Sequence, residues 1–229
     1  MAGSLPTVPG FRSAIVGCKQ SVQQVVSGTG KVQTRVVGAH LTTISLQYPP
    51  MKRAEFAPID SFIMSQRGRD ESFTLVMPDK AAPLGAVSGS PVLYADVAAG
   101  ADTIVLDELV PGTADVFVAS DIINFGGYSK VHKVAFSAAS PDSPRLLEDG
   151  TPRLLEDGSE RNMEEHGTVT LTISPPLYKA LTKGDAVNYS NVAYTMKYKT
   201  DSQEVKITAP RFYAKQIELE EYLSWWLEK

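Results

Sequence analysis

The stretch YPPMKRAEFAPIDSFIMSQRGRDESFTLVMP, from Tyr48 to Pro78, predicts a strand, a short helix and a second strand in succession. Pro49 and Pro50 end the first strand, since proline has no N–H to donate to a sheet. Apolar residues then recur at helical spacing and form one stripe: Phe56, Ile59, Phe62 and Ile63.

The ends of this helix follow from two special residues. Pro58 clashes with the carbonyl four residues earlier, so the helix begins near Ala57 or bends at the proline. Gly68 lies just past the apolar stripe, where a helix C-terminus favours a residue that tolerates positive φ. The residues after it alternate as in a strand with one apolar face, formed by Phe73, Leu75 and Met77.

Val32 to Tyr48 is predicted to be a long strand, because its apolar residues share one parity. Gly38 and Ala39 interrupt it, which indicates a bulge or a hairpin turn. The preceding SGTGKV segment lacks the spacing of a phosphate-binding loop and predicts a turn that leads into this strand.

The run from Gly30 to Pro78 resembles the distal tail proteins of siphophages, the long-tailed, non-contractile bacteriophages. Two motifs carry the resemblance: a Gly-Lys-x-Gln-x-Arg lead that starts at Gly30, and the string Arg-Ala-Glu-Phe-Ala-Pro from Arg53 to Pro58. The similarity is strong over about the first third of the chain and loose over its C-terminal strands.

The resemblance implies a mainly β protein: a β-sandwich-like, tail-tube-like framework with one short helix. It also implies a structural role at the virion tail tip, after synthesis in the host cytoplasm. We expect a homo-hexameric ring that connects the tail tube protein to the baseplate hub or tail-tip protein. Members of this family are structural subunits, so the resemblance supplies no catalytic, cofactor-binding or metal-binding residue.

Composition fits such a protein. The 229 residues are 43% hydrophobic and 21% charged, as in ordinary globular chains. No run approaches the length of a membrane span, and the N-terminal residues do not resemble a signal peptide. The single cysteine, Cys18, excludes an internal disulfide, and we expect it to be a buried or half-buried apolar residue.

The region 84–190 differs from the rest of the chain in amino-acid composition and net charge. It follows a Gly, Ala, Ser and Pro-rich boundary and holds 7 Lys or Arg against 15 Asp or Glu, a net charge of −8, whereas the remainder carries +4. Its short strand candidates, among them 116–118 and 122–125, predict an inserted OB-like β-barrel. Residues 1–83 and 191–229, with a further strand candidate at 193–198, are expected to form the framework domain. The acidic charge disfavours specific nucleic-acid binding.

Within this region PRLLEDGT, from Pro144, is repeated immediately as PRLLEDGS, from Pro152. Two copies are too few for a solenoid, so a duplicated solvated loop is the simplest interpretation. A calcium site is the alternative, with acidic ligands that do not match a known spacing: Glu148, Asp149, Glu156, Asp157 and Glu160.

No arrangement of residues predicts an enzyme: the three histidines are far apart, and there is no GxSxG or HExxH motif. The alternative to a ring subunit is a carbohydrate-binding module of the tail tip that recognises a host surface glycan. Its stacking platforms would be aromatic residues of the insert, although such residues are more often core: Tyr94, Phe117, Phe125, Tyr128, Tyr178 and Tyr189.

The segment EYLSWWLEK, from Glu221 to Lys229, contains both tryptophans. Glu220 and Glu221, which precede its apolar residues, and Lys229 at its end are typical of a helix of one or two turns. So short a helix must dock, either on its own subunit's sheet or on an adjacent subunit or tail protein. The candidate assembly interface comprises Tyr222, Leu223, Trp225, Trp226 and Leu227.

Overall fold

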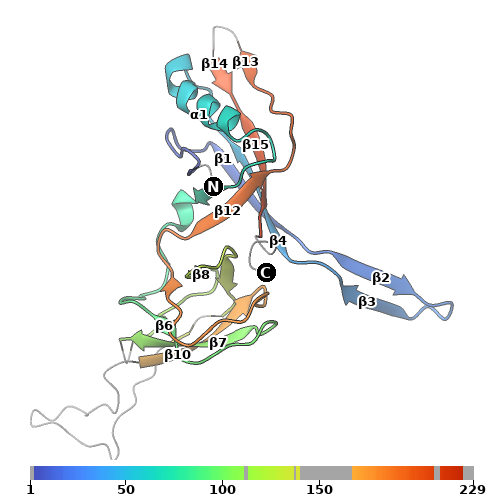
Figure 1. Ribbon diagram of the computed structural model, residues 1–229, viewed down its shortest axis with the longest axis vertical. Coiled ribbons are helices and arrows are strands. Elements are labelled where there is room, and N and C mark those ends of the chain that lie inside the picture. The colour runs from blue at the N-terminus through green and yellow to red at the C-terminus, as the bar shows by residue number, and fades with distance from the viewer. Residues whose placement is uncertain (1–2, 111–112, 137, 140–166, 209–211, 224–229) are drawn as a thin grey trace, which may run out of the picture. The chain divides into compact units, whose positions relative to one another are not determined.

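The computed structural model describes residues 3–110, 113–136, 138–139, 167–208 and 212–223 (Figure 1). The chain divides into two compact units. The framework unit comprises Met1–Pro78 and Ala193–Lys229, and the barrel unit comprises Asp79–Val192. Leu84 and Ser190, the expected ends of the insert, both lie in the barrel unit.

The described residues are mainly β with one α-helix, which confirms the expected fold class. The framework unit contains β1 (Ser13–Lys19), β2 (Val22–Val26), β3 (Val32–Val36), β4 (Leu41–Gln47), α1 (Arg53–Ser65), β5 (Phe73–Val76), β12 (Ala193–Tyr198), β13 (Lys206–Thr208), β14 (Phe212–Ala214) and β15 (Gln216–Glu221). The 3₁₀ turn η1 (Pro78–Lys80) spans the boundary between the two units in sequence. The barrel unit contains β6 (Val92–Leu93), β7 (Thr103–Leu109), β8 (Ile122–Phe125), β9 (His132–Val134), β10 (Gly167–Ser174) and β11 (Val187–Asn188).

A five-stranded antiparallel sheet, in the order β1-β4-β15-β12-β5, is the centre of the framework unit. Alternate residues of β4, β5, β12 and β15 are buried, as the period of two predicts for a sheet with one covered face. The buried set includes Ile44, Leu46, Phe73, Leu75, Tyr194, Met196, Tyr198, Ile217 and Leu219.

Helix α1 packs on this sheet through the predicted apolar stripe. Phe56, Ile59 and Ile63 are buried, and the Phe62 ring meets Phe73 edge-on at 5.3 Å. Burial of each such side chain contributes about 1.5–3 kcal/mol. The β13–β14 hairpin lies beside the helix (Figure 1), where Tyr213 stacks on Phe56 at 5.3 Å.

The helix begins at Arg53, so the expected start near Ala57 is wrong and Pro58 lies inside the helix. The N-terminus is stabilised because the Glu55 side chain accepts a hydrogen bond from the Lys52 N–H at 3.0 Å. A proline in the second turn removes only one backbone hydrogen bond. Gly68 has a φ of 70°, as expected for the turn that follows the helix.

The six-stranded sheet of the barrel unit has the order β11-β8-β9-β10-β7-β6. Its two edge strands also approach each other, because Leu93 N–H donates to Asp185 and Val187 N–H donates to Pro91. The sheet is therefore nearly closed around an apolar core that includes Leu106, Phe117, Phe125 and Leu171. The unit is therefore a small, nearly closed barrel, as expected, and its six strands compare with the five of an OB-fold.

Candidate assembly surface

The two edges of the framework sheet are treated differently. N-terminal residues cover the β5 edge: Leu5 N–H donates to the Thr74 carbonyl at 2.9 Å, and Thr74 N–H donates to Gly3 at 3.0 Å. At the opposite edge, β1 pairs with β4 on one side, and no strand of the described residues pairs with its other side. An uncovered edge strand is a template for pairing with another chain.

Cys18 and Ile15 lie on this open strand. Cys18 is exposed, so the expectation of a buried or half-buried thiol is wrong. Burial is absent because β1 is the last strand of the sheet and nothing in the described chain covers it. Ile15 is 66% exposed, which is unusual for isoleucine in a strand beside a well-packed core.

The strands β1 and β4 continue beyond the sheet as a second antiparallel ribbon, β2–β3, which extends away from it (Figure 1). We call residues Val22–Val36 the arm. The interruption at Gly38 is the join between arm and sheet rather than a hairpin turn: Val37 N–H donates to Ser21 at 2.9 Å, so the ribbon continues across it. The SGTG segment is the tip, as its turn composition predicted, and Gly30 has a φ of 78°.

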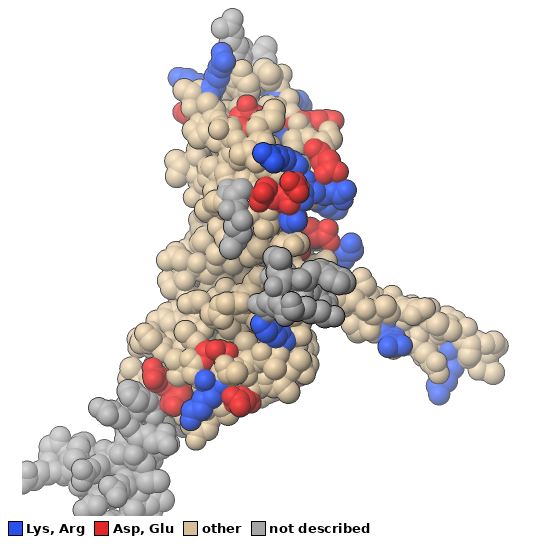
Figure 2. Space-filling view, viewed as in Figure 1, with Lys and Arg blue, Asp and Glu red and all other residues tan. Residues whose placement is uncertain are grey.

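Register divides the arm into two unlike faces. One face, the valine face, presents three cross-strand pairs without a charge: Val22 with Val36, Gln24 with Thr34, and Val26 with Val32. The opposite face pairs Gln23 with Arg35 and Val25 with Gln33. The four valines of the valine face are between 51% and 62% exposed. Figure 2 shows Lys and Arg but no Asp or Glu on the arm, in agreement with its sequence.

The sequence pattern did not predict the arm as a separate hairpin. The alternation around Val32 and Val36 predicted a strand correctly, but alternation does not say whether the apolar face is covered. The signal that could have identified a hairpin is the mirrored pattern VQQVV and KVQTRV on either side of the SGTG turn.

The other face of the framework sheet carries exposed ion pairs. Lys19 lies 3.6 Å from Glu220, and Lys199 lies 3.2 Å from Glu218. Such exposed pairs contribute little to stability, typically about 0.2–1 kcal/mol. They give this face a mixed-charge character that suits a hydrated contact rather than an apolar one.

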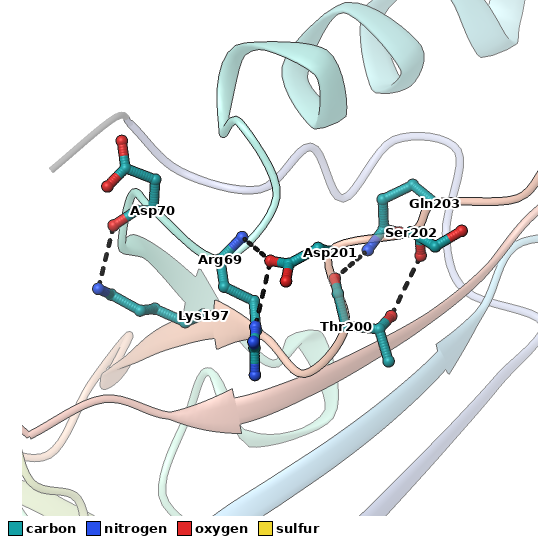
Figure 3. Close-up of polar contacts among 7 residues, drawn as sticks. All are labelled: Arg69, Asp70, Lys197, Thr200, Asp201, Ser202 and Gln203. Atoms are coloured by element: carbon teal, nitrogen blue, oxygen red, sulfur yellow. Dashed lines mark hydrogen bonds and ion pairs between the residues drawn. The ribbon is translucent and has the colours of Figure 1, made fainter.

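The turns at one end of the sheet are held by polar contacts (Figure 3). Asp201 accepts hydrogen bonds from the Arg69 backbone at 3.2 Å and from its guanidinium at 3.1 Å. The guanidinium, and then the backbone N–H, lower the pKa of the Asp201 carboxyl. Lys197 of β12 donates to the Asp70 carbonyl at 3.0 Å, so the turn after α1 is held both by Asp201 and by strand β12.

Two hollows contain titratable groups. In the framework unit, an open groove of about 890 Å³ has Lys215 in its wall. Burial lowers the pKa of Lys215, whose amine donates to the Glu204 carbonyl at 2.7 Å. In the barrel unit, Asp121 lines a hollow of about 180 Å³ but accepts hydrogen bonds from three backbone N–H groups, those of Leu84, Gly85 and Val118. Both groups hold loops in place.

The aromatic platforms proposed for glycan binding are mostly core residues. Phe117, Phe125 and Tyr128 are buried in the barrel. Tyr178 stacks on Tyr128 at 4.4 Å and is only partly buried, as is Tyr189. Tyr94 is 47% exposed, and the Lys183 amine lies 5.5 Å from its ring centroid. Of the six candidates, Tyr94 therefore has the exposure that a stacking platform needs.

The candidate interface at the end of the chain is described in part. Glu220 and Glu221 belong to strand β15, so the expected helix does not begin there; pairing with β4 and β12 extends the strand instead. Tyr222 N–H donates to Thr195 at 2.9 Å, and Leu223 is buried. Trp225, Trp226 and Leu227 lie outside the described residues.

The acidic PRLLEDG repeat, with Glu148, Asp149, Glu156, Asp157 and Glu160, also lies outside the described residues. Among the residues that the structure does describe, no group of His, Cys, Asp and Glu side chains has the geometry of a metal site. Within those same residues, none of the helices combines the length and the apolar character that a membrane crossing requires.

The chain matches no protein-family model, and no curated protein sequence matches it.

Proposed function

We propose that the chain is a structural subunit of a siphophage tail tip, which forms a homo-hexameric ring between the tail tube protein and the baseplate hub. The resemblance of Gly30–Pro78 to distal tail proteins suggests this role, and the uncovered edge of β1 is the structural observation that carries it. The protein is not an enzyme in this proposal.

Ring closure accounts for the difference between the two sheet edges. In a cyclic ring each contact joins two unlike surfaces, so one open edge and a different receiving surface suffice. An edge already covered by Gly3–Leu5 is unavailable for strand pairing, whereas β1 offers backbone groups and exposed apolar side chains. The ring thereby satisfies an edge that would otherwise invite uncontrolled pairing.

The experiment is to measure assembly of the purified chain by native mass spectrometry, with Ile15→Lys as the test variant. Lysine on an edge strand is a common means by which proteins prevent edge pairing. We expect the wild type to form a closed ring and Ile15→Lys to shift to monomer without unfolding. Met64→Lys is the matched control, because Met64 is 74% exposed on α1 and does not lie on the edge.

Cys18 supplies a second readout on the same strand. As the single, exposed cysteine, it should react with a thiol reagent rapidly in the monomer and slowly in the ring. A wild type that stays monomeric at all concentrations, and in assembled tails, would contradict the proposal. Equal labelling of Cys18 in monomer and ring would place the contact elsewhere.

The glycan-binding alternative rests on Tyr94. Its half-exposed ring beside the Lys183 amine is compatible with stacking against a sugar. A glycan array with the wild type and Tyr94→Ala tests it: binding that Tyr94→Ala abolishes would support this second role, which is compatible with ring formation.

A further inference from the structure

The valine face of the arm is exposed among the residues that the structure describes. A two-stranded ribbon is at best marginally stable by itself in water, and this one presents four valines on one uncharged face. The two valine pairs flank the polar but uncharged pair of Gln24 and Thr34, and exposed apolar side chains gathered on one face often mark a contact site. The opposite face of the arm is more polar, with Arg35 and two glutamines beside a single valine, Val25.

The end of strand β15 lies at the base of the arm. β15 runs antiparallel to β4, with Gln216 opposite Gln47 and Glu220 opposite Thr43. The Glu221 carboxylate then accepts a hydrogen bond from the Thr42 N–H at 2.8 Å. Strand β4 begins at Leu41, just after β3 and the join. The residues that follow Glu221 therefore start beside the place where the arm meets the sheet.

The six residues that follow have the composition and the reach to cover the valine face. Ser224–Lys229 contains two tryptophans and a leucine, and tryptophan buries more apolar area than most side chains. Six extended residues span about 20 Å, and the five residues of β3 span about 17 Å. Attachment to the same chain gives the segment a high effective concentration at its own arm.

We propose that Ser224–Lys229 packs on the valine face of the arm of the same chain, with Trp225 and Trp226 against Val22 and Val36. The arm and the end of the chain then stabilise each other, and the arm keeps its strand edges for other contacts. This inference does not depend on the proposed ring, because both partners belong to one chain.

Intrinsic fluorescence tests the proposal directly, because the chain's two tryptophans are both in this segment. The variant Val22→Thr/Val36→Thr replaces apolar methyls of the valine face by hydroxyls and keeps β-branched side chains. We expect a red shift of tryptophan emission and stronger quenching by acrylamide. Val25→Thr is the matched control: Val25 is 56% exposed on the opposite face of the same ribbon, and its replacement should leave emission unchanged.

A cross-link keeps the test decisive if the threonine variant disturbs the arm. In a Cys18→Ser background, Val36→Cys with Trp225→Cys should form an intramolecular disulfide on oxidation, and Val25→Cys with Trp225→Cys should not. Wild-type emission typical of fully solvated tryptophan, or equal cross-linking from both positions, would overturn the proposal. Emission that changes with protein concentration, with cross-links between chains, would overturn it in favour of docking on a second copy.

Discussion

Gly85 illustrates how a single residue limits the packing of the barrel unit. A Cβ at this position would overlap the Val116 carbonyl oxygen and lie 2.9 Å from the Phe117 Cα. These neighbours are backbone atoms, which cannot rotate away as a flexible side chain would. The Gly85 N–H also donates to the Asp121 carboxylate at 3.2 Å, so this loop cannot shift without loss of that contact.

We therefore expect Gly85→Ala to destabilise the barrel by about 1–3 kcal/mol, the usual cost of overpacking. Chemical denaturation followed by circular dichroism measures the loss. Gly126→Ala is the matched control in the same unit, since its Cβ would meet only the Ala186 carbonyl at 3.9 Å. Equal stability of the two variants would contradict the packing argument.

Two buried tyrosines of the framework unit differ in one hydrogen bond. The Tyr48 hydroxyl donates to the Pro6 carbonyl at 2.6 Å, whereas the Tyr198 hydroxyl is buried without a hydrogen-bond partner among the described residues. We expect Tyr48→Phe to cost about 1 kcal/mol and Tyr198→Phe to be neutral or stabilising, because it removes an unsatisfied polar group. Thermal or urea unfolding of the pair measures the difference, and a larger loss for Tyr198→Phe would contradict it.

The same burial predicts a loss of stability at alkaline pH. Burial raises the pKa of Tyr48 and Tyr198, and it raises the pKa of Tyr194 to about 12, with a smaller contribution from Glu221. The unfolded chain releases these protons near pH 10, whereas the folded chain retains them, so stability falls as pH rises from about 10 to 12. Urea unfolding across this range should show the fall, and Tyr198→Phe should make it shallower; a stability that rises there would exclude this cause.

At the scale of elements, the sequence predicted what depends on local pattern. Residues 122–125 and 193–198 were expected as strands and are β8 and β12, and the apolar stripe of α1 packs as its spacing indicated. Residues 116–118 were also expected as a strand, yet Phe117 makes only an isolated bridge with Ala138. The sequence left the start of α1 open, either near Ala57 or earlier with a bend at Pro58; the helix begins at Arg53, and the burial of Phe56 and Ile59 supports its first turns.

The candidate surface was less predictable than the elements that form it. Alternation in β2 and β3 is the same whether their apolar face is covered or not, so the exposure of Val22 and Val36 follows only from the tertiary arrangement. The open edge of β1 likewise depends on which strand is last in the sheet. The end of the chain was expected as a helix from its charges, but strand pairing of Glu220 and Glu221 prevailed.

At the scale of the whole chain, each unit has its two points of connection close together. Strands β5 and β12 are antiparallel neighbours, and Val76 pairs with Ala193, so the residues that leave and re-enter the framework lie side by side. Within the barrel unit, Asn191 N–H donates to the Ala81 carbonyl at 2.7 Å, so the two ends of that unit also meet. Adjacent ends are typical of inserted domains that fold independently.

This geometry predicts that each unit folds without the other. Replacement of Asp79–Val192 by a short Gly-Ser linker turns β5 and β12 into a hairpin whose register is already set by Val76 and Ala193. We expect a soluble framework with one cooperative unfolding transition and the same oligomeric state as the full chain, measured by calorimetry and native mass spectrometry.

The separate fragment Asp79–Val192 is the matched control and should unfold cooperatively by itself, because its apolar core is formed by its own strands. An insoluble framework together with an unfolded fragment would mean that the two units are one inseparable domain, and a folded framework that no longer assembles would transfer the ring contact to the barrel.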